Sequence, residues 1–328
     1  MAKGRTQREQ NPFKNSDTNK RYYTYDYYLR KTFGGKCAKL PIDAGFTCPN
    51  IDGRCGLGGC IYCSGRGSGD FAELPSLSIP EQIESTRKKL GSKWSVERVI
   101  PYFQAHTNTY APTEVLREKF YEALNTEGAV GLNIATRADC LEDETVKLLG
   151  ELSEKTVLTV ELGLQTTNDE SASFINRGHS FEDFKLGYQK LRNENKKINI
   201  CVHIIFGLPN ETEEEMLKTV RDVAALCPDQ VKLHLLHVIK GTKLAKIYEQ
   251  GDYIPMEREV YIDVVCKAIE LLPPDTVVAR VTGDGMADDL LAPMWSKRKV
   301  AVINDIDKLL FERQTCQGAK YSEKYSEN

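Results

Sequence analysis

Three cysteines on one glycine-rich loop, followed by a long alternation of strand and helix patterns, constrain this chain more than any other feature. Cys48 precedes Cys60 by twelve residues, and Cys63 completes a CxxC pair on the same loop. Three neighbouring thiolates can hold three irons of a [4Fe–4S] cube and leave the fourth iron open to a further ligand. Cys55 lies inside the loop as well, and four thiols could instead make a closed tetrahedral zinc site. The spacing alone leaves both metals open.

The overall composition is that of a globular protein. The 328 residues are enough for one large α/β domain or two smaller ones. No apolar run approaches the length that crosses a bilayer, and the polar, basic start of the chain has no apolar core of a secretory signal. We therefore expect a cytoplasmic protein with no membrane contact. Its ten cysteines are then expected to be ligands and buried thiols and not disulfides.

The N-terminal segment differs in charge from the rest of the chain. The net charge of the whole chain is −3, yet residues 1–39 carry ten basic side chains and three acidic ones. Aromatic rings lie between them, and cations beside rings are typical of a surface that binds RNA phosphates and bases. Candidate RNA contacts in this segment are Tyr22, Tyr23, Arg30 and Lys31. A solvated basic tail followed by a tyrosine-rich packing segment is the alternative.

Apolar runs predict strands at six places, and helical periodicity fills the intervals between them. The strands are expected at 37–42, 99–104, 130–135, 157–163, 198–206 and 231–238. Strand–helix units in series predict a parallel sheet with right-handed crossovers. Six units are too few to close the usual eight-stranded barrel, so we expect an α/β fold with a partial (β/α)6 TIM-like barrel. Reactive groups of such a fold gather at the C-terminal ends of the strands.

The remaining segments are expected to be extensions of this core. We predict a basic, tyrosine-rich N-terminal extension over residues 1–36 and a core over 37–240. Residues 241–328 are expected to form a C-terminal extension that binds substrate and ends in a disordered tail. A further strand is predicted at 277–281.

Several motifs, taken in order, resemble those of a known superfamily. The segment KLPIDAGFTCPN at 39–50 is close to the signature of small bacterial radical S-adenosylmethionine (SAM) proteins with a widened cysteine loop in place of CxxxCxxC. The motifs TRAD (136–139), VELGLQT (160–166), NRGH (176–179) and HIIFGLP (203–209) are similar to those in the radical SAM domain of the elongator catalytic subunit, which acts on wobble uridine in tRNA. The resemblance covers roughly residues 35–240.

This resemblance implies the cofactors and the residues that hold them. It places a [4Fe–4S] cluster on Cys48, Cys60 and Cys63, with SAM on the open iron, and it implies an electron donor such as flavodoxin or ferredoxin. Cys55 departs from the pattern and is left out of the cluster set. The residues expected to contact the cluster or SAM are Tyr62, Gln104, Thr136, Arg137, Glu161, Gln165 and Gly207.

The chemistry of the side chains is compatible with several of the roles that the resemblance implies. The side-chain carbonyl of Gln104 can accept a hydrogen bond from the SAM amino group, and the guanidinium of Arg137 can pair with the SAM carboxylate. A charged Glu161 in an otherwise apolar strand is costly unless it is satisfied, which favours a ligand-facing role. Gly207 is expected to let the backbone approach the adenine.

Candidate substrate contacts outside the N-terminal segment lie near predicted strand ends and in one basic cluster. They are Asn108, Tyr110, Lys240, Lys297 and Arg298, the last two beside a tryptophan. A polar turn or a surface helix would show the same residue types.

The combined prediction is a radical SAM enzyme that modifies the C5 side chain of wobble uridine in tRNA. No acetyltransferase domain is expected after the radical core, so one version converts a carboxymethylaminomethyl group to an aminomethyl group. A radical SAM enzyme that acts on a small molecule or peptide remains open. A zinc-stabilised RNA-binding protein without catalysis, using Cys48, Cys55, Cys60 and Cys63, is the third possibility.

Overall fold

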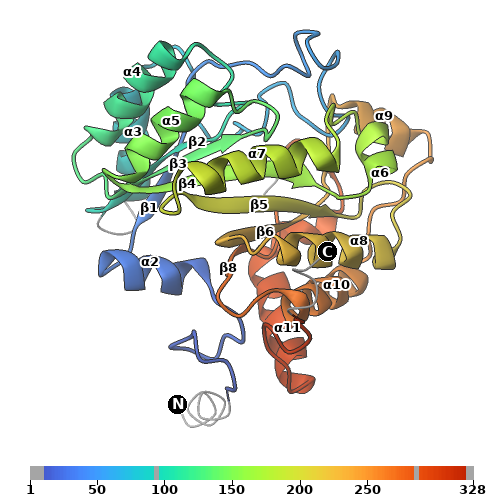
Figure 1. The fold of residues 1–328 in the computed structure, drawn as a ribbon. Helices are drawn as coiled ribbons and strands as arrows, with labels where there is room; N and C mark the ends of the chain where they lie inside the picture. The colour runs from blue at the N-terminus through green and yellow to red at the C-terminus, as the bar shows by residue number, and fades with distance from the viewer. Residues whose placement is uncertain (1–10, 92–95, 284–287, 323–328) are drawn as a thin grey trace. The chain divides into compact units, whose positions relative to one another are not determined.

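Strands and helices alternate along the chain, as the sequence predicts. The computed structural model describes residues 11–91, 96–283 and 288–322. Its main sheet has seven strands whose order follows the chain (Figure 1): β1 (Ala38–Ile42), β2 (Val99–Phe103), β3 (Gly131–Thr136), β4 (Val157–Gln165), β5 (Asn199–Phe206), β6 (Gln230–Leu235) and β8 (Val277–Arg280). An order without reversal is that of a TIM-like barrel, and seven strands fall short of the eight that close one. The predicted partial barrel is confirmed, with the strand expected at 277–281 as its seventh.

The cysteine loop belongs to one of two compact units into which the chain divides. This loop unit comprises Thr32–Leu164 and Ala172–Cys201. In it, β1 pairs with β2, β2 with β3 and β3 with β4, all in parallel. Each of four helices packs on the next along the outside of these strands (Figure 1): α3 (Ile79–Gly91), α4 (Thr113–Leu124), α5 (Asp143–Ser153) and α7 (Phe181–Glu194).

Local sequence signals explain where these elements begin. Ser78 opens α3, because its hydroxyl and N–H both donate to the Glu81 carboxylate, at 2.7 and 2.8 Å. Ser180 opens α7 in the same way with Asp183. Every residue of β2 is buried, as expected of a strand covered on both faces.

The second compact unit contains both ends of the described chain. This terminal unit comprises the chain up to Lys31, Gln165–Ser171 and the chain from Val202 onward. In it β6 pairs with β8 in parallel, and β7 (Val238–Ile239) pairs with β9 (Leu290–Ala292) in antiparallel fashion. Its helices are α2 (Tyr25–Phe33), which begins there, α8 (Glu213–Ala225), α9 (Lys243–Glu249), α10 (Arg258–Leu271), the 3-10 helix η1 (Met294–Arg298) and α11 (Lys299–Glu312). The short helix α6 (Asp169–Phe174) begins in this unit and ends in the loop unit.

Within the terminal unit the N-terminal segment pairs with the C-terminal one. The Val278 N–H donates to the Tyr23 carbonyl at 2.8 Å, and the Tyr23 N–H donates to Gln317 Oε1 at 2.8 Å. The domain boundaries expected at 36 and 240 stay a prediction. The first ten residues of the predicted extension and the end of the tail expected to be disordered, 323–328, lie outside the described residues.

Candidate active site

The cysteine loop connects β1 to α3, at the C-terminal end of the first strand. Cys48, Cys60 and Cys63 are half-buried there, whereas Cys55 is exposed. A tight turn closes the CxxC pair, because the Cys63 N–H donates to the Cys60 carbonyl at 3.1 Å. Gly59, with φ of +73°, supplies the left-handed turn directly before Cys60. The strand end and this turn therefore bring the thiols to the edge at which a partial barrel carries its reactive groups.

Burial and neighbouring thiols raise the pKa values of Cys60 and Cys63. Burial, and then the neighbouring Cys60 and Cys48, raise the pKa of Cys63 far above its usual range. Burial is also the main cause that raises the pKa of Cys60, while Arg137 acts in the opposite direction and Cys48 adds to the rise. Thiols with raised pKa values need a bound cation to become the thiolates that act as metal ligands. An all-sulfur donor set of this kind fits an iron–sulfur cluster or zinc.

The segment that leads into α7 fastens the cysteine loop from outside. The Ile61 N–H donates to the Ile175 carbonyl at 3.0 Å, and Asn176 Nδ2 donates to the Gly59 carbonyl at 2.7 Å. Asn176 adopts a left-handed φ of +55°, which is uncommon for a residue other than glycine. The NRGH motif thus holds the backbone around Cys60.

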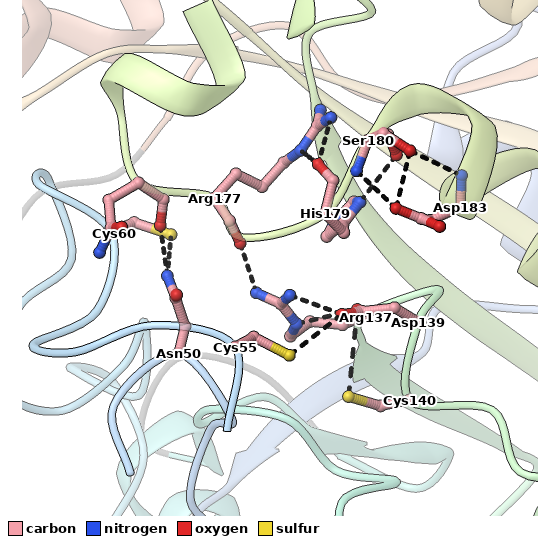
Figure 2. Close-up of polar contacts among 11 residues, drawn as sticks. Asn50, Cys55, Cys60, Arg137, Asp139, Cys140, Arg177, His179, Ser180 and Asp183 are labelled. Atoms are coloured by element: carbon pink, nitrogen blue, oxygen red, sulfur yellow. Dashed lines mark hydrogen bonds and ion pairs between the residues drawn. The ribbon is translucent and has the colours of Figure 1, made fainter. Parts of the chain in front are cut away.

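Arg177, the next residue of that motif, is a buried structural cation. Its guanidinium donates to the His179 carbonyl at 2.8 and 2.9 Å (Figure 2). It also donates to the Leu164 carbonyl at 2.5 Å. These bonds shape the turn between Asn176 and α7. Arg177 thus has a structural role in the NRGH motif.

Arg137 is held by the protein itself. Its guanidinium forms a two-point ion pair with Asp139, at 2.9 and 2.7 Å, and donates to the Arg177 carbonyl at 2.6 Å (Figure 2). Burial lowers the pKa of Arg137, but the bonds to Asp139 outweigh that effect and raise it overall. The expected ion pair with a SAM carboxylate stays a prediction, and the structure shows that Asp139 already binds two of the three guanidinium nitrogens. Asp139 lies two residues after Arg137 in the TRAD motif, and that spacing was the missed signal.

Glu161 also has partners within the protein. Its carboxylate is fully buried and binds the Lys39 ammonium, and Asn133 Nδ2 donates to it at 2.8 Å. Lys39 in turn lies over the Tyr102 ring, 3.6 Å from its centroid. The argument that an unsatisfied charge implies a ligand is therefore corrected: the charge is balanced by a lysine more than a hundred positions away in the sequence.

Comparison with known proteins decides the family. The model of the Radical SAM superfamily matches residues 50–223, and that of the Radical_SAM C-terminal domain matches residues 228–312. The chain is 45% identical to the protein YtqA of Bacillus subtilis over 94% of this chain and 96% of that one. It is 35% identical to the protein YhcC of Escherichia coli, over 87% of this chain and 90% of that one. This chain belongs to the radical SAM superfamily.

A solved structure supports the radical SAM fold. An archaeal Elp3 of Methanocaldococcus infernus, lacking its residues 1–46, matches 86% of this chain and 64% of that chain with a TM-score of 0.63 at 18% identity. At that identity the likeness concerns the fold. The protein is a radical SAM enzyme, with a [4Fe–4S] cluster and SAM as its cofactors.

The other residues expected to contact the cofactors in the loop unit lie at the ends of β1, β2 and β3. Gln104, half-buried, follows β2 and donates its N–H to the Ile42 carbonyl at 3.1 Å. Thr136 is buried, and its hydroxyl lies 2.5 Å from that of Thr109. Tyr62 is half-buried on the cysteine loop, and its pKa is raised by burial and then by Cys60 and Cys63. Tyr62 therefore lies beside the thiols, and its expected contact with the cluster or SAM stays a prediction.

Asn108 and Tyr110 occupy the strand end beyond Gln104. Asn108 is fully buried and donates to the Ala135 carbonyl at 2.8 Å, while its Oδ1 accepts no hydrogen bond from any residue that the structure describes. Tyr110 lies under the guanidinium of Arg54, 5.5 Å from its ring centroid. Tyr110 lines a recess of about 340 Å³ beside the cysteine loop, and Asn108 directly precedes another lining residue, Thr109. The lining consists of Arg54, Thr109, Tyr110, Ala111, Pro112, Cys140 and Glu142.

Gln165 and Gly207 belong to the terminal unit. Gln165 ends β4 with a left-handed φ of +65°, a conformation that is uncommon for a side chain of this type and is often found at functional sites. Gly207 has a φ of +82°, and a Cβ atom there would lie 2.9 Å from the Met256 side chain. Its N–H faces Met216 Sδ at 3.3 Å, and its carbonyl accepts from the Tyr253 hydroxyl at 2.7 Å. Close packing of Met256 thus already accounts for this glycine.

The expected RNA contacts of the N-terminal segment need a correction. Tyr22 and Tyr23 are only 4% and 9% exposed, so their rings are not available to stack on bases. Tyr23 packs with Phe13 and Val277, which supports the packing interpretation of this segment. Arg30 is bound by Asp17, at 2.5 Å, and by Asp26, at 2.9 Å.

The other basic candidates remain accessible. Lys31, Lys240, Lys297 and Arg298 are exposed, and the ammonium of Lys240 donates to the Asp288 carbonyl at 2.5 Å. In the part of the chain that the structure describes, no helix is both long and apolar enough to cross a membrane.

Proposed function

We propose that this radical SAM enzyme holds its cluster on Cys48, Cys60 and Cys63 and modifies the C5 side chain of wobble uridine in tRNA. The proposed substrate rests on a sequence similarity. The chain is 31% identical to a tRNA uridine(34) acetyltransferase of Methanocaldococcus jannaschii over 158 residues, which are 47% of this chain and 28% of that protein. A related radical core in a protein named for uridine 34 favours the same nucleoside over a small molecule.

The geometry of the thiols supports the choice of ligands. Cys48, Cys60 and Cys63 are half-buried, and Cys60 and Cys48 both contribute to the raised pKa of Cys63, whereas Cys55 is exposed and its Sγ lies 3.9 Å from a carboxylate oxygen of Asp139. A carboxylate close to a thiol opposes its ionisation, and Asp139 is one cause of the raised pKa of Cys55, after burial. Three protein thiolates leave one iron open, and four would not.

The residues of the chain prepare this site before any substrate arrives. With SAM, the cluster supplies a 5′-deoxyadenosyl radical that abstracts hydrogen. The Asn176 amide fixes the backbone next to Cys60, and Arg137 is held beside the thiols by Asp139. The free Oδ1 of buried Asn108 is an acceptor of the kind that an amino group of SAM or substrate would need.

Exposed cations offer a surface for the tRNA. Lys31, Lys240, Lys297 and Arg298 are exposed, and all four belong to the terminal unit. Such cations bind phosphates without reading sequence, so the choice of nucleoside must come from groups near the thiols. We assign that role to Tyr110 and Asn108, and we assign delivery of electrons to a small redox protein such as flavodoxin or ferredoxin.

Nucleoside mass spectrometry of tRNA tests this proposal. Purified protein would be reconstituted anaerobically and incubated with SAM, dithionite and bulk tRNA from a strain that lacks the gene. We expect 5′-deoxyadenosine together with a changed wobble uridine, for example a carboxymethylaminomethyl group converted to an aminomethyl group. Formation of 5′-deoxyadenosine with every wobble uridine unchanged would refute the tRNA substrate and favour a small molecule or peptide. A colourless protein that binds zinc and forms no 5′-deoxyadenosine would refute the cluster assignment.

A further inference from the structure

Asn50 is part of the cysteine loop and binds the turn, at Asn176, that fastens this loop. Its side chain is fully buried, and its Nδ2 donates to Cys60 Sγ at 3.6 Å, a distance suited to a sulfur acceptor (Figure 2). The same Nδ2 donates to the Asn176 carbonyl. The backbone carbonyl of Asn50 accepts a hydrogen bond from the Gly59 N–H at 2.8 Å. Asn50 is therefore bound to the residue before Cys60, to the Cys60 sulfur and to the turn that fastens the loop.

The surroundings determine which way the Asn50 amide points. Cys60 Sγ and the Asn176 carbonyl are both acceptors, so a flipped amide would set its Oδ1 against two electron-rich atoms. A Cβ atom on Gly56 would lie 2.2 Å from Asn50 Oδ1, and one on Gly178 would lie 2.8 Å from it. Two glycines thus leave just enough room for the amide in the orientation that aims its N–H at the sulfur.

A donor at this sulfur has a predictable effect on a cluster bound there. Reduction adds negative charge, part of which resides on the ligand sulfurs, and an N–H that points at one of them stabilises that charge. Hydrogen bonds to the sulfurs are among the factors that set the reduction potential of iron–sulfur clusters. Groups that hydrogen-bond to a metal ligand orient that ligand and commonly change the affinity and the reduction potential of the metal.

We propose that Asn50 is a positioning residue that aims Cys60 at the cluster and raises the cluster's reduction potential through its N–H···S bond. The inference rests on the proposed role of Cys60 as a ligand. It concerns how readily the cluster accepts the electron that starts the reaction.

The test compares the midpoint potential of the reconstituted cluster, followed by electron paramagnetic resonance, in three variants and the wild type. Asn50→Ala removes the donor. Gly56→Ala keeps Asn50 but places a methyl group where its Oδ1 lies, so the amide must turn away from Cys60. Asn193→Ala, at an exposed position of α7, is the matched control. We expect both site variants to shift the potential negatively by about 59 mV, which is tenfold in a one-electron reduction equilibrium, and the control to leave it unchanged.

Iron content and the urea unfolding of the apo protein separate positioning from general stability. Wild-type potentials in fully loaded Asn50→Ala and Gly56→Ala would overturn the inference. Loss of iron from variants whose apo form unfolds like the wild type would support it, because Cys60 is then misplaced in an intact fold. Loss of iron together with an equally destabilised apo form would overturn it in favour of a structural role. A wild-type protein that binds no cluster on these cysteines would instead refute the proposed function.

Discussion

At the scale of single residues, the site depends on buried charges that the protein balances internally. The Arg137 side chain is 10% exposed and its partner Asp139 is 16% exposed. Removing one member of a buried ion pair leaves the other uncompensated, which is far more costly than losing a surface pair. Arg137 and Asp139 therefore hold each other in position and so help to shape the site.

Replacement of Asp139 tests this view. We expect Asp139→Asn to lower the free energy of unfolding of the apo protein by on the order of 3 kcal/mol, measured by urea denaturation. Asp143→Asn is the control, because that carboxylate is 81% exposed where it pairs with Lys190 and should contribute no more than about 1 kcal/mol. Equal losses in the two variants would contradict the account.

A second residue makes the stability depend on pH. Burial, and then the positive charge of Arg177, lower the pKa of His179 from 6.5 to about 4 in the folded chain. Between pH 6.5 and 4 the unfolded chain binds a proton at this site that the folded chain does not bind, so the free energy of unfolding falls as the pH falls. We expect His179→Gln to make that fall less steep in urea titrations from pH 7 to 4.5. An unchanged slope would show that His179 titrates normally.

At the scale of elements, α7 packs directly on the backbone that carries Arg137. A Cβ atom on Gly187 would lie 2.2 Å from the Ala138 carbonyl oxygen. The glycine therefore permits a close approach of helix and loop that no other residue would allow. Helix α5 offers a contrast, because a Cβ atom on Gly150 would meet the end of the Glu194 side chain, which can move aside.

Alanine substitutions in these two helices should have opposite effects. Gly150→Ala should be neutral or raise the free energy of unfolding by up to about 1 kcal/mol, since alanine is the better helix former. Gly187→Ala should lower it by about 2 kcal/mol, because the helix must move away from the Ala138 backbone. Thermal and urea unfolding of both variants would decide the matter, and stabilisation by Gly187→Ala would contradict this packing.

The sequence predicted the elements better than it predicted the partners of buried polar groups. The strands lie within a few residues of their expected positions because hydrophobic periodicity is a local signal. The argument from an unbalanced charge at Glu161 failed because its partner Lys39 is distant in the sequence and no local pattern indicates the pairing. Tyr22 and Tyr23 were misassigned for the same reason. Gln317 and Val277, which contact Tyr23, come from the other end of the chain. The position of Asn50, two residues after Cys48, was the available signal for its role.

At the scale of the whole molecule, tRNA binding should depend on exposed cations and not on the buried tyrosines. Each phosphate contact that is lost weakens binding and lowers its dependence on salt. We expect the double variant Lys297→Glu/Arg298→Glu to bind tRNA more weakly and to reduce the slope of log affinity against log salt by about 1 to 2. Lys308→Glu reverses one exposed charge on α11 and is the control for the effect of a single charge reversal elsewhere on the surface. Wild-type affinity and slope in the double variant would remove this surface from the proposal.

The central claim is that three of the four loop cysteines hold the cluster that cleaves SAM. The most direct measurement is the yield of 5′-deoxyadenosine from anaerobically reconstituted protein with SAM and dithionite, in four serine variants. The account predicts background yield and lost iron for Cys48→Ser, Cys60→Ser and Cys63→Ser, and a yield near that of the wild type for Cys55→Ser, whose thiol is exposed and faces Asp139. Retained activity in any of the first three, or abolished activity in Cys55→Ser, would contradict it.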